Sequence, residues 1–332
     1  MERAQLLGRR ISELGLDVAG SRVEQLVKRL HSELEARGVA FRPPVYLSDQ
    51  WGCPDGTPLI GVPFYLADKR LERLEAEHAG SIESDEEAMR YLRHEAGHAV
   101  NYAFLLHERA EFGPLFGDYA RPYREHYAAD PLSREHVRHI LGWYAQKHPD
   151  EDFAETFAVW LTPDGDWRTE YAGWGALRKL EWVDRVMGEV ATLSPAVPAL
   201  TEDDLPVDAM HWTLAEHYAG DEPMPVEDAR QFDADLRRVF ANSADAPAGE
   251  EAANFLRRHE GELVARISYW GGVGPMAVRS LVRALAERAA ALRLHVSGLE
   301  AATLIELTAF GTAVAMHWRY QHVRGAARGG TR

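Results

Sequence analysis

Residues 85–107, DEEAMRYLRHEAGHAVNYAFLLH, are the stretch of sequence from which the fold and the chemistry can best be predicted. The flanks are apolar at helical spacing, which predicts one long helix packed inside a domain. His94, Glu95 and His98 stand at its centre as H-E-x-x-H. Because residues four apart lie on one face of a helix, both imidazoles can reach the same metal ion. Two such histidines are half of a tetrahedral zinc site.

Glu95 and Gly97 add to this interpretation. Glu95 directly follows the first histidine, so its carboxylate lies beside the metal without ligating it. There it can act as general base and accept a proton from a water that zinc activates. Gly97 costs about 1 kcal/mol relative to Ala in the middle of a helix. We therefore expect another backbone, or the substrate, to approach the helix closely at this position.

A second helix is expected over residues 149–161, PDEDFAETFAVWL, where Pro149 and several acids occupy the first turn. Acids at a helix N-terminus can serve only to complement the helix dipole. The H-E-x-x-H pair lacks a third ligand, however, and a Glu from a later helix can supply it while the fourth position stays open to water. Glu151 fits this role best, and Glu155 can hydrogen-bond a ligand histidine through its other nitrogen. The alternative, with Glu155 as the ligand and Glu151 outside the site, stays open.

HEAGHAV, followed roughly fifty residues later by E-D-F-A-E, resembles the gluzincin metallopeptidases. In that group the second motif supplies the third zinc ligand and then the acid that supports a ligand histidine. The catalytic domain of anthrax lethal factor has a similar layout, with a Tyr seven residues before the ligand Glu that assists the oxyanion. This resemblance implies the same role for Tyr144, which stands seven residues before Glu151.

The stretch from RPPVYLSDQW to WRTEYAGWGALRKLEWVD also resembles bacterial proteins described only as zinc-binding metallopeptidases. The resemblance covers roughly the first 190 residues. The chain departs from some of these relatives because it has no Cys-rich zinc ribbon at its N-terminus. What the resemblance implies is a zinc enzyme that hydrolyses a peptide or protein substrate.

The composition sets limits on the class of protein. A chain of 332 residues, 46% hydrophobic and 27% charged, is ordinary for a soluble globular protein. The N-terminus predicts no secretory signal, and the most apolar stretch, 301–318, is too short and too interrupted to span a membrane. Cys53 is the only cysteine, so we expect a reducing, cytoplasmic location. The net charge of −15 disfavours partners such as nucleic acid and anionic membranes.

Further elements are expected in the first half of the chain. Amphipathic helices are predicted over 3–15 and 21–37, a charged helix over 67–78 and a helix capped by Ser133 over 133–148. VYLSDQW and TPLIGVPFYLA predict a hairpin or two neighbouring strands. Pro63 limits the second run to an edge strand or to a strand that ends early. Such an edge could pair with an extended substrate, or it could simply close a small sheet.

The aromatic, Pro-broken segment 111–131 is expected to be irregular. It could form a lid or binding wall, or it could pack Phe112, Phe116, Tyr119 and Tyr123 against the surface. Five histidines near the motifs are expected to be packing or solvent residues rather than ligands: His107, His126, His136, His139 and His148. His148 stands at the expected N-cap beside Pro149 and is the one candidate among them for a substrate contact.

After a Pro-rich connection at 192–206, the chain predicts helices near 208–218, 226–242, 247–268, 275–293 and 297–320, and a disordered basic tail over 324–332. We therefore expect a zincin-like metallopeptidase domain over 1–190 and a helical domain of unknown role over 205–323. The predicted fold class is α+β and predominantly helical. It comprises a gluzincin-like domain with a small edge-strand sheet and an all-helical C-terminal half.

Two functions compete. One is a zinc metallopeptidase, and the other is a non-hydrolytic zinc-containing module that binds or regulates a partner. Glu95 favours the enzyme, because a purely structural zinc site has no use for a base beside an open coordination position.

Overall fold

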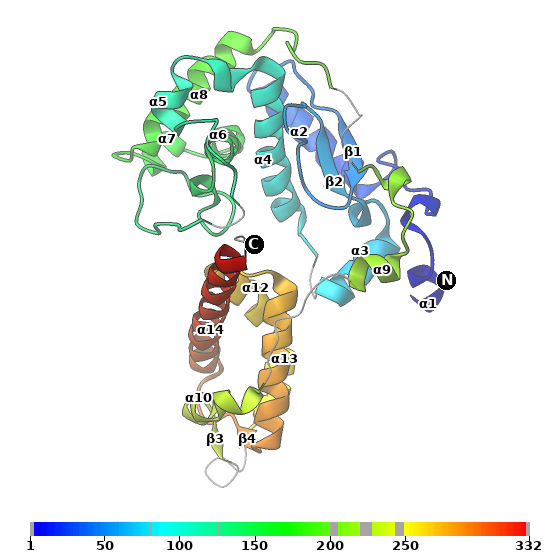
Figure 1. Ribbon diagram of the computed structural model, residues 1–332, viewed down its shortest axis with the longest axis vertical. Coiled ribbons are helices and arrows are strands. Elements are labelled where there is room, and N and C mark those ends of the chain that lie inside the picture. The colour runs from blue at the N-terminus through cyan, green and yellow to red at the C-terminus, as the bar shows by residue number, and fades with distance from the viewer. Residues whose placement is uncertain are drawn as a thin grey trace. The chain divides into compact units, whose positions relative to one another are not determined.

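The computed structural model describes residues 3–79, 82–124, 127–199, 205–219, 228–242 and 249–329. These residues are predominantly helical with two small pairs of strands, which agrees with the expected balance of helix and sheet (Figure 1). The chain divides into two compact units. The first comprises Met1–Glu75 and Ile82–His217, and the second comprises Ala76–Ser81 and Tyr218–Arg332.

The helices of the first unit, with α3 and α9 ending across its boundary, are α1 (Arg3–Leu7), α2 (Arg22–Ala36), α3 (Lys69–Ala79), α4 (Asp85–Phe104), α5 (Phe112–Phe116), α6 (Pro149–Leu161), α7 (Trp167–Glu170), α8 (Ala176–Val190) and α9 (Leu214–Ala219). Short 3-10 turns add η1 (Ile11–Glu13), η2 (Phe64–Ala67), η3 (Leu106–Glu108), η4 (Tyr144–Gln146) and η5 (Val207–Ala209). α4 lies between α2 and β2 (Ile60–Pro63) on one side and α6 on the other (Figure 1).

α4 is the predicted metal helix, and its start is fixed by local hydrogen bonds. Ser84 Oγ accepts from Glu87 N at 3.2 Å, and Glu87 Oε2 accepts from Ser84 N at 2.9 Å. This capping box satisfies two main-chain donors of the first turn. The helix ends at Phe104, because Leu105 adopts a left-handed conformation with φ 51°. The predicted extension to His107 is therefore wrong, and the chain continues into η3 instead.

At Gly97, α4 and α6 lie very close together. A Cβ atom added to Gly97 would lie 2.7 Å from Ala154 Cα and 3.0 Å from Ala154 O. Real Cβ atoms do not come this close to other atoms, so only glycine fits without a shift of one backbone. The expected close approach at Gly97 is confirmed, and its partner is the backbone of α6.

On the side away from α6, α4 packs against α2. The bounds of α2 agree with the helix predicted over 21–37 to within one residue at each end. Leu26, Leu30 and Leu34 of α2 are buried, as the apolar spacing indicates. Arg93 of α4 and Glu33 of α2 form a buried bidentate pair, with Nε–Oε2 and Nη2–Oε1 both at 2.7 Å. Such charge-assisted pairs also fix geometry, so this contact sets the rotation of α4 against α2.

The small sheet has a topology that differs from a hairpin. β1 (Val45–Ser48) pairs with β2 in parallel, with Val45 opposite Ile60 and Ser48 opposite Pro63. Of the two predictions, the neighbouring strands are confirmed and the hairpin is wrong. The turn residues CPDG lie in the connection between β1 and β2, which returns the chain to the end of the sheet where β1 begins, so that β2 runs in the same direction. Pro63 is the last residue of β2, which agrees with a strand that ends early.

As the second run predicts, β2 is an edge strand, because its sheet consists of β1 and β2, but an isolated bridge to Gly52 covers part of its outer edge. Gly52 N donates to Gly61 O at 3.3 Å, and Gly61 N donates to Gly52 O at 2.7 Å. β2 is therefore bonded to β1 on one side and to the segment around Gly52 on the other. Any strand that added to this sheet from that side would meet Gly52 and its neighbours first.

Two helices predicted for the first unit are not formed over their predicted ranges. The stretch 3–15 holds only α1 and η1, and the stretch 133–148 holds only η4. In the second stretch Ile140 N donates to Glu155 Oε2 at 2.7 Å, and Arg138 N donates to Tyr171 Oη at 3.1 Å. Trp143 is left-handed with φ 56°. Main-chain donors that a helix would use internally are bound by side chains of other elements, so the segment stays irregular.

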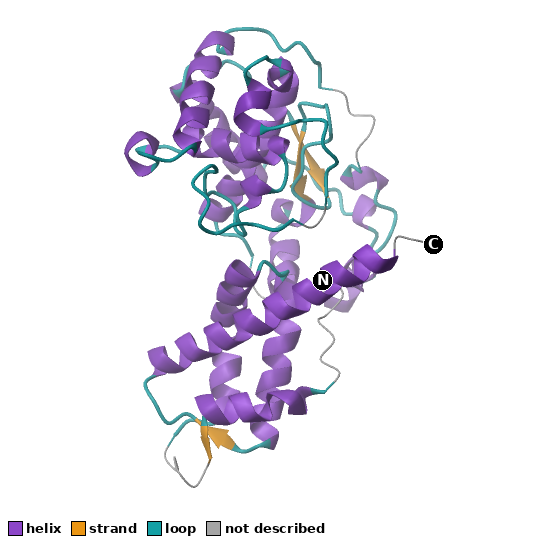
Figure 2. Ribbon diagram, turned by 60° about the vertical axis from the view of Figure 1, so that its left-hand side comes forward, coloured by secondary structure: helices purple, strands orange, loops and turns teal. Residues whose placement is uncertain are grey.

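The second unit contains η6 (Ala229–Phe232), α10 (Asp233–Val239), α11 (Ala252–Arg258), α12 (Glu260–Gly271), α13 (Pro275–Ala291) and α14 (Glu300–Gly329) (Figure 2). β3 (Ala241–Asn242) and β4 (Leu294–His295) pair antiparallel, so the expectation of an all-helical half is wrong in this detail. The break expected at WGGVGP is confirmed by the left-handed Gly272. The core contains, among others, Phe255, Leu263, Ile267, Leu281, Leu285 and Leu307.

Two expectations for the end of the chain meet different outcomes. α14 continues to Gly329, so most of the predicted disordered tail is helical, and residues 330–332 lie outside the described part. Among the described residues, no helix has the length and apolar character that crossing a membrane requires.

Replacing Gly97 with Ala tests the contact between α4 and α6. Although Ala favours helix, we expect Gly97→Ala to lower the free energy of unfolding by about 1–3 kcal/mol, because the new methyl group meets backbone that cannot move aside. The matched control is Gly188→Ala in α8, where nothing lies within 4 Å of the added Cβ. That change should be neutral or stabilising by up to about 1 kcal/mol. Denaturant titration of metal-depleted protein measures both, and equal effects would contradict the close packing.

Candidate metal centre

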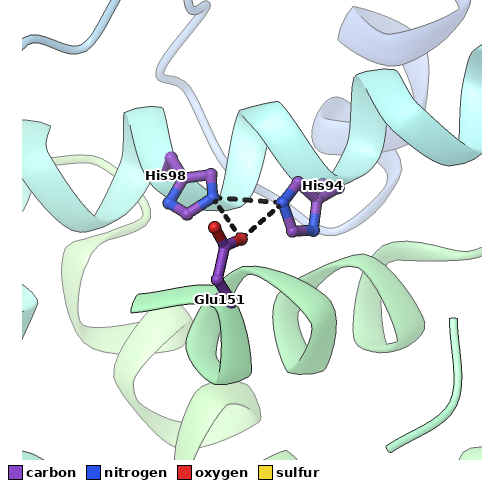
Figure 3. A group of neighbouring side chains, drawn as sticks. All are labelled: His94, His98 and Glu151. Atoms are coloured by element: carbon purple, nitrogen blue, oxygen red, sulfur yellow. Dashed lines mark hydrogen bonds and ion pairs between the residues drawn. The ribbon is translucent and has the colours of Figure 1, made fainter. Parts of the chain in front are cut away.

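Three predicted ligands converge where α4 faces the first turn of α6 (Figure 3). His94 Nε2 and His98 Nε2 are 3.1 Å apart. Glu151 Oε2 lies 3.0 Å from His94 Nε2 and 3.2 Å from His98 Nε2. All three side chains are buried, and within the described ranges they are the group whose His, Cys, Asp or Glu atoms could hold a metal ion. The three come from two helices whose spacing is set at Gly97.

The other nitrogen of each histidine faces a carboxylate. His94 Nδ1 lies 2.9 Å from Glu155 Oε1, and His98 Nδ1 lies 3.0 Å from Asp150 Oδ2. Because a carboxylate accepts, each ring places its proton on Nδ1 and presents the lone pair of Nε2 to the centre. In the structure, Glu151 thus lies beside the Nε2 atoms of both histidines, whereas Glu155 lies beside Nδ1 of His94, on the far side of that ring.

This arrangement fits a zinc ion. Two Nε2 lone pairs and one carboxylate oxygen face one another with no donor between them, which is unfavourable unless a cation or added protons lie among them. Their separations of 3.0–3.2 Å are close to the roughly 3.3 Å between ligand atoms of a tetrahedral ion with bonds of 2.0–2.1 Å. Imidazole and carboxylate are also ligands that zinc accepts in sites that keep an open position.

Without metal, protons serve the same purpose. Burial lowers the pKa of His94, but hydrogen bonds to Glu151 and Glu155 outweigh it and raise this pKa to about 9. Burial raises the pKa of Glu151, but the two histidines outweigh it and hold this pKa below the usual range of a glutamate. Metal and protons therefore compete for the same three side chains.

Glu95 lies in the same cavity as the ligands and is buried. Within the described chain it forms no hydrogen bond or ion pair. Burial raises the pKa of its carboxyl group. A carboxylate with a raised pKa and no partner is suited to accept a proton, which agrees with the position expected for a base.

Tyr144 also reaches the centre, although it lies in η4 and not at the end of a helix. Its Oη donates to Glu151 Oε1 at 3.1 Å. Tyr123 Oη donates to the same oxygen. Glu151 therefore offers Oε2 to the histidines while two phenols hold Oε1. Burial raises the pKa of Tyr144, so its hydroxyl group remains a donor at neutral pH.

The aromatic segment 111–131 both packs and lines the cavity, so its two interpretations each hold for a part. Phe112 and Phe116 are buried, and Phe116 contacts Trp182 with ring centroids 5.5 Å apart. Tyr119 and Tyr123 line the cavity instead. Phe112 and Phe116 are thus anchored in the core, whereas Tyr119 and Tyr123 form part of the cavity wall.

The other histidines also have places in the structure. His148 caps α6, since its Nδ1 accepts from Asp150 N at 3.2 Å, and its Nε2 lies 2.9 Å from Arg121 O. His139 Nε2 lies 3.0 Å from Arg90 O. His126 lies outside the described residues. In the structure, both ring nitrogens of His148 face the main chain.

Asp150 is the residue of the centre that the sequence analysis missed. It faces His98 Nδ1 and accepts from Asn101 Nδ2 at 2.8 Å and Tyr102 Oη at 2.6 Å. Burial raises its pKa, but His98 and these donors outweigh it and lower the pKa to about 2. The available signal was that Asn101 and Tyr102 stand three and four residues after His98, on the same helix face.

The cavity beside the centre has a volume of about 630 Å³. The segment Gln50–Cys53 lines it together with the ligands, Glu95 and side chains of the aromatic wall. Cys53 Sγ donates to Thr57 O at 3.2 Å, and burial raises the pKa of its thiol well above the ordinary value. A thiol whose pKa is raised in this way forms little thiolate at neutral pH and is poorly suited to act as a nucleophile.

Residues 82–181 match the model of a family described as "Putative zinc-binding metallo-peptidase". The matched segment contains α4 and α6, and with them His94, Glu95, His98 and Glu151. No curated protein and no solved structure matches the chain.

The ligand set predicts one zinc ion per chain. His94→Ala and His98→Ala should lose it, and Glu151→Ala should bind it far more weakly, because each variant removes an atom that faces the ion. Glu155→Ala should retain zinc with an affinity lowered about 10–100-fold, since it only orients His94. Elemental analysis and chelator competition measure these effects. Full zinc in Glu151→Ala together with loss in Glu155→Ala would show that Glu155 is the third ligand.

Proposed function

We propose that this chain is a zinc-dependent metallopeptidase that hydrolyses peptide bonds, with His94, His98 and Glu151 as the metal ligands. The observation that carries the proposal is the convergence of His94, His98 and Glu151 in one cavity with Glu95, whose carboxylate has no partner among the described residues. The family match over residues 82–181 and the resemblance of the two motifs to the gluzincins support it.

Bound zinc would supply an activated water and polarise the carbonyl group of the scissile bond. Glu95 then accepts the proton of the attacking water and passes it to the nitrogen of the leaving amine. Its raised pKa suits this exchange, because the group must both take up and release a proton near neutral pH.

Tyr144 is proposed to donate its hydroxyl hydrogen to the oxygen on which negative charge develops. Its Oη lies one hydrogen bond from the ligand Glu151, so a substrate carbonyl near the ion comes within its reach. Tyr123 holds the same carboxylate oxygen and can keep Glu151 in place when Tyr144 turns to the substrate.

The rival interpretation is a non-hydrolytic zinc-containing binding or regulatory module. Structural zinc sites usually have four protein ligands, whereas three converge among the described residues here and a cavity adjoins them. The carboxylate of Glu95 beside that cavity supports hydrolysis over a structural role.

Glu95→Gln tests the proposed base. The variant should retain zinc and fold but lose peptide hydrolysis, because an amide cannot accept the proton of water. The matched control is Asp55→Asn, which removes another acidic charge from the lining of the same cavity and should keep most of the activity. Turnover of a proteome-derived peptide library, with and without chelator, is the measurement. Hydrolysis by Glu95→Gln at the wild-type rate would refute the assignment.

Tyr144→Phe tests the proposed oxyanion donor. Loss of one such donor typically lowers kcat by about 10²–10³, while zinc content and Tm should stay near wild type because Tyr123 still bonds Glu151. Tyr123→Phe, which removes the other phenol from the same oxygen, serves as the control and should change kcat less. If Tyr144→Phe loses zinc and leaves the kcat of the zinc-loaded fraction unchanged, Tyr144 only positions Glu151.

A further inference from the structure

We propose that Lys147 and Arg121 form a subsite for a substrate carboxylate, so that preferred peptides carry a carboxylate close to the bond that is cleaved. This inference rests on the proposed peptidase function and names the class of its substrate. The carboxylate could be the C-terminus of a peptide or the side chain of an Asp or Glu.

Lys147 and Arg121 line the cavity beside the candidate metal ligands. Neither forms an ion pair with any carboxylate in the part of the chain that the structure describes. Several cations of the first unit do pair in this way, among them Arg22, Arg29, Arg93, Arg109, Lys179 and Arg185. Others, such as Lys69 and Arg134, form no ion pair with a described carboxylate, so the distinguishing feature of Lys147 and Arg121 is their place in the cavity. In a chain with a net charge of −15, two unpaired cations in one cavity indicate an anionic ligand.

Lys147 is held in position before any ligand binds. Its Nζ lies 4.4 Å from the ring centroid of Tyr123 and 5.1 Å from that of Tyr144. It also donates to Tyr144 Oη at 3.4 Å. An ammonium group has three donors, so this single hydrogen bond leaves two for a carboxylate. Two aromatic faces restrict the long side chain, which reduces the entropy lost on binding.

Arg121 is tied to the same wall. Its Nη2 donates to the main-chain oxygen of Lys147 at 2.8 Å, and its own main-chain oxygen lies 2.9 Å from His148 Nε2. A guanidinium group has five donors in a planar fork, so this bond leaves several that can bind a carboxylate oxygen. The Arg121 guanidinium group therefore lies against the backbone of Lys147, and both cations belong to the same cavity wall.

The position of Lys147 places the subsite near the reacting bond. Its Nζ contacts Tyr144 Oη, which in turn donates to the ligand Glu151. A carbonyl bound between the ion and Tyr144 therefore lies one contact from the ammonium group. A substrate carboxylate at Lys147 belongs to a residue at or next to the cleaved bond.

The test uses zinc-loaded Glu95→Gln protein, so that binding is measured without turnover. Peptides are compared in two kinds of matched pair. In one kind the C-terminus is either free or amidated, and in the other a residue beside the bond that wild type cleaves is either Glu or Gln. If wild type cleaves no peptide, the Glu or Gln is placed at each position in turn. We expect the carboxylate form of at least one pair to bind about tenfold more tightly or better, because charge-assisted hydrogen bonds are stronger than neutral ones. The pair that shows the preference identifies the source of the carboxylate.

Lys147→Met, added to this protein, should abolish most of the preference while the neutral peptides bind as before. Lys147→Arg should retain part of it, and Lys69→Met, at an exposed position of α3, should change nothing. Melting temperatures check that each variant folds. Equal binding within every pair overturns the inference, and so does an equal loss for charged and neutral peptides in Lys147→Met, which would mean that Lys147 only positions Tyr144.

Failure of this inference can be told apart from failure of the proposed function. If wild type hydrolyses peptides without regard to their charge and binding shows no preference, the peptidase stands and the subsite is wrong. If the preference for carboxylates is found but no peptide is hydrolysed, the subsite stands and the enzymatic function is wrong. If no peptide binds at all, the subsite for a peptide carboxylate is overturned.

Discussion

The contact between Gly97 and Ala154 is the constraint on which the rest of the first unit depends. A side chain at position 97 would meet the α6 backbone at 2.7 Å, so the two helices approach as closely as they do only because Gly97 has none. His94 and His98 lie on either side of this contact in the sequence, and Glu151 lies three residues before Ala154. Backbone contact between the helices therefore brings all three ligand atoms within 3.2 Å of one another.

The close contact places an unusual amount of charge inside the protein. Asp150, Glu151, Asp152 and Glu155 of α6 are all buried. Burial of a carboxylate is costly unless it is paired or hydrogen-bonded, and each of these groups has partners. Asp152 pairs with Lys179 at 2.5 Å, and Glu155 accepts from Ile140 N as well as facing His94. The irregular segment 133–148 is thus part of the support for the centre.

One helix therefore supplies a core face, a candidate metal ligand and the acids that face the Nδ1 atoms of both histidines. Phe153 of α6 contacts Trp182, and Asp150 and Glu151 line the cavity opposite its aromatic and cationic wall. Because that wall comes from an aperiodic segment, its side chains are positioned by contacts with the centre itself, such as those of Tyr123 and Tyr144 with Glu151. Glu151 therefore both faces the histidines and fixes the positions of the wall residues Tyr123 and Tyr144.

The sequence by itself determined most of α4, the range of α6 with Pro149 in its first turn, the candidate ligands and the close approach at Gly97. These follow from local rules: helical period, end signals and the spacing of chemically specific residues on one face. Only the tertiary structure decided that Asp150 supports His98, that β1 and β2 are parallel, that Gly52 covers β2, and that residues 133–148 are not helical. Each of these depends on hydrogen bonds between segments far apart in the chain, and no local pattern records which distant group a main-chain donor or a carboxylate will meet.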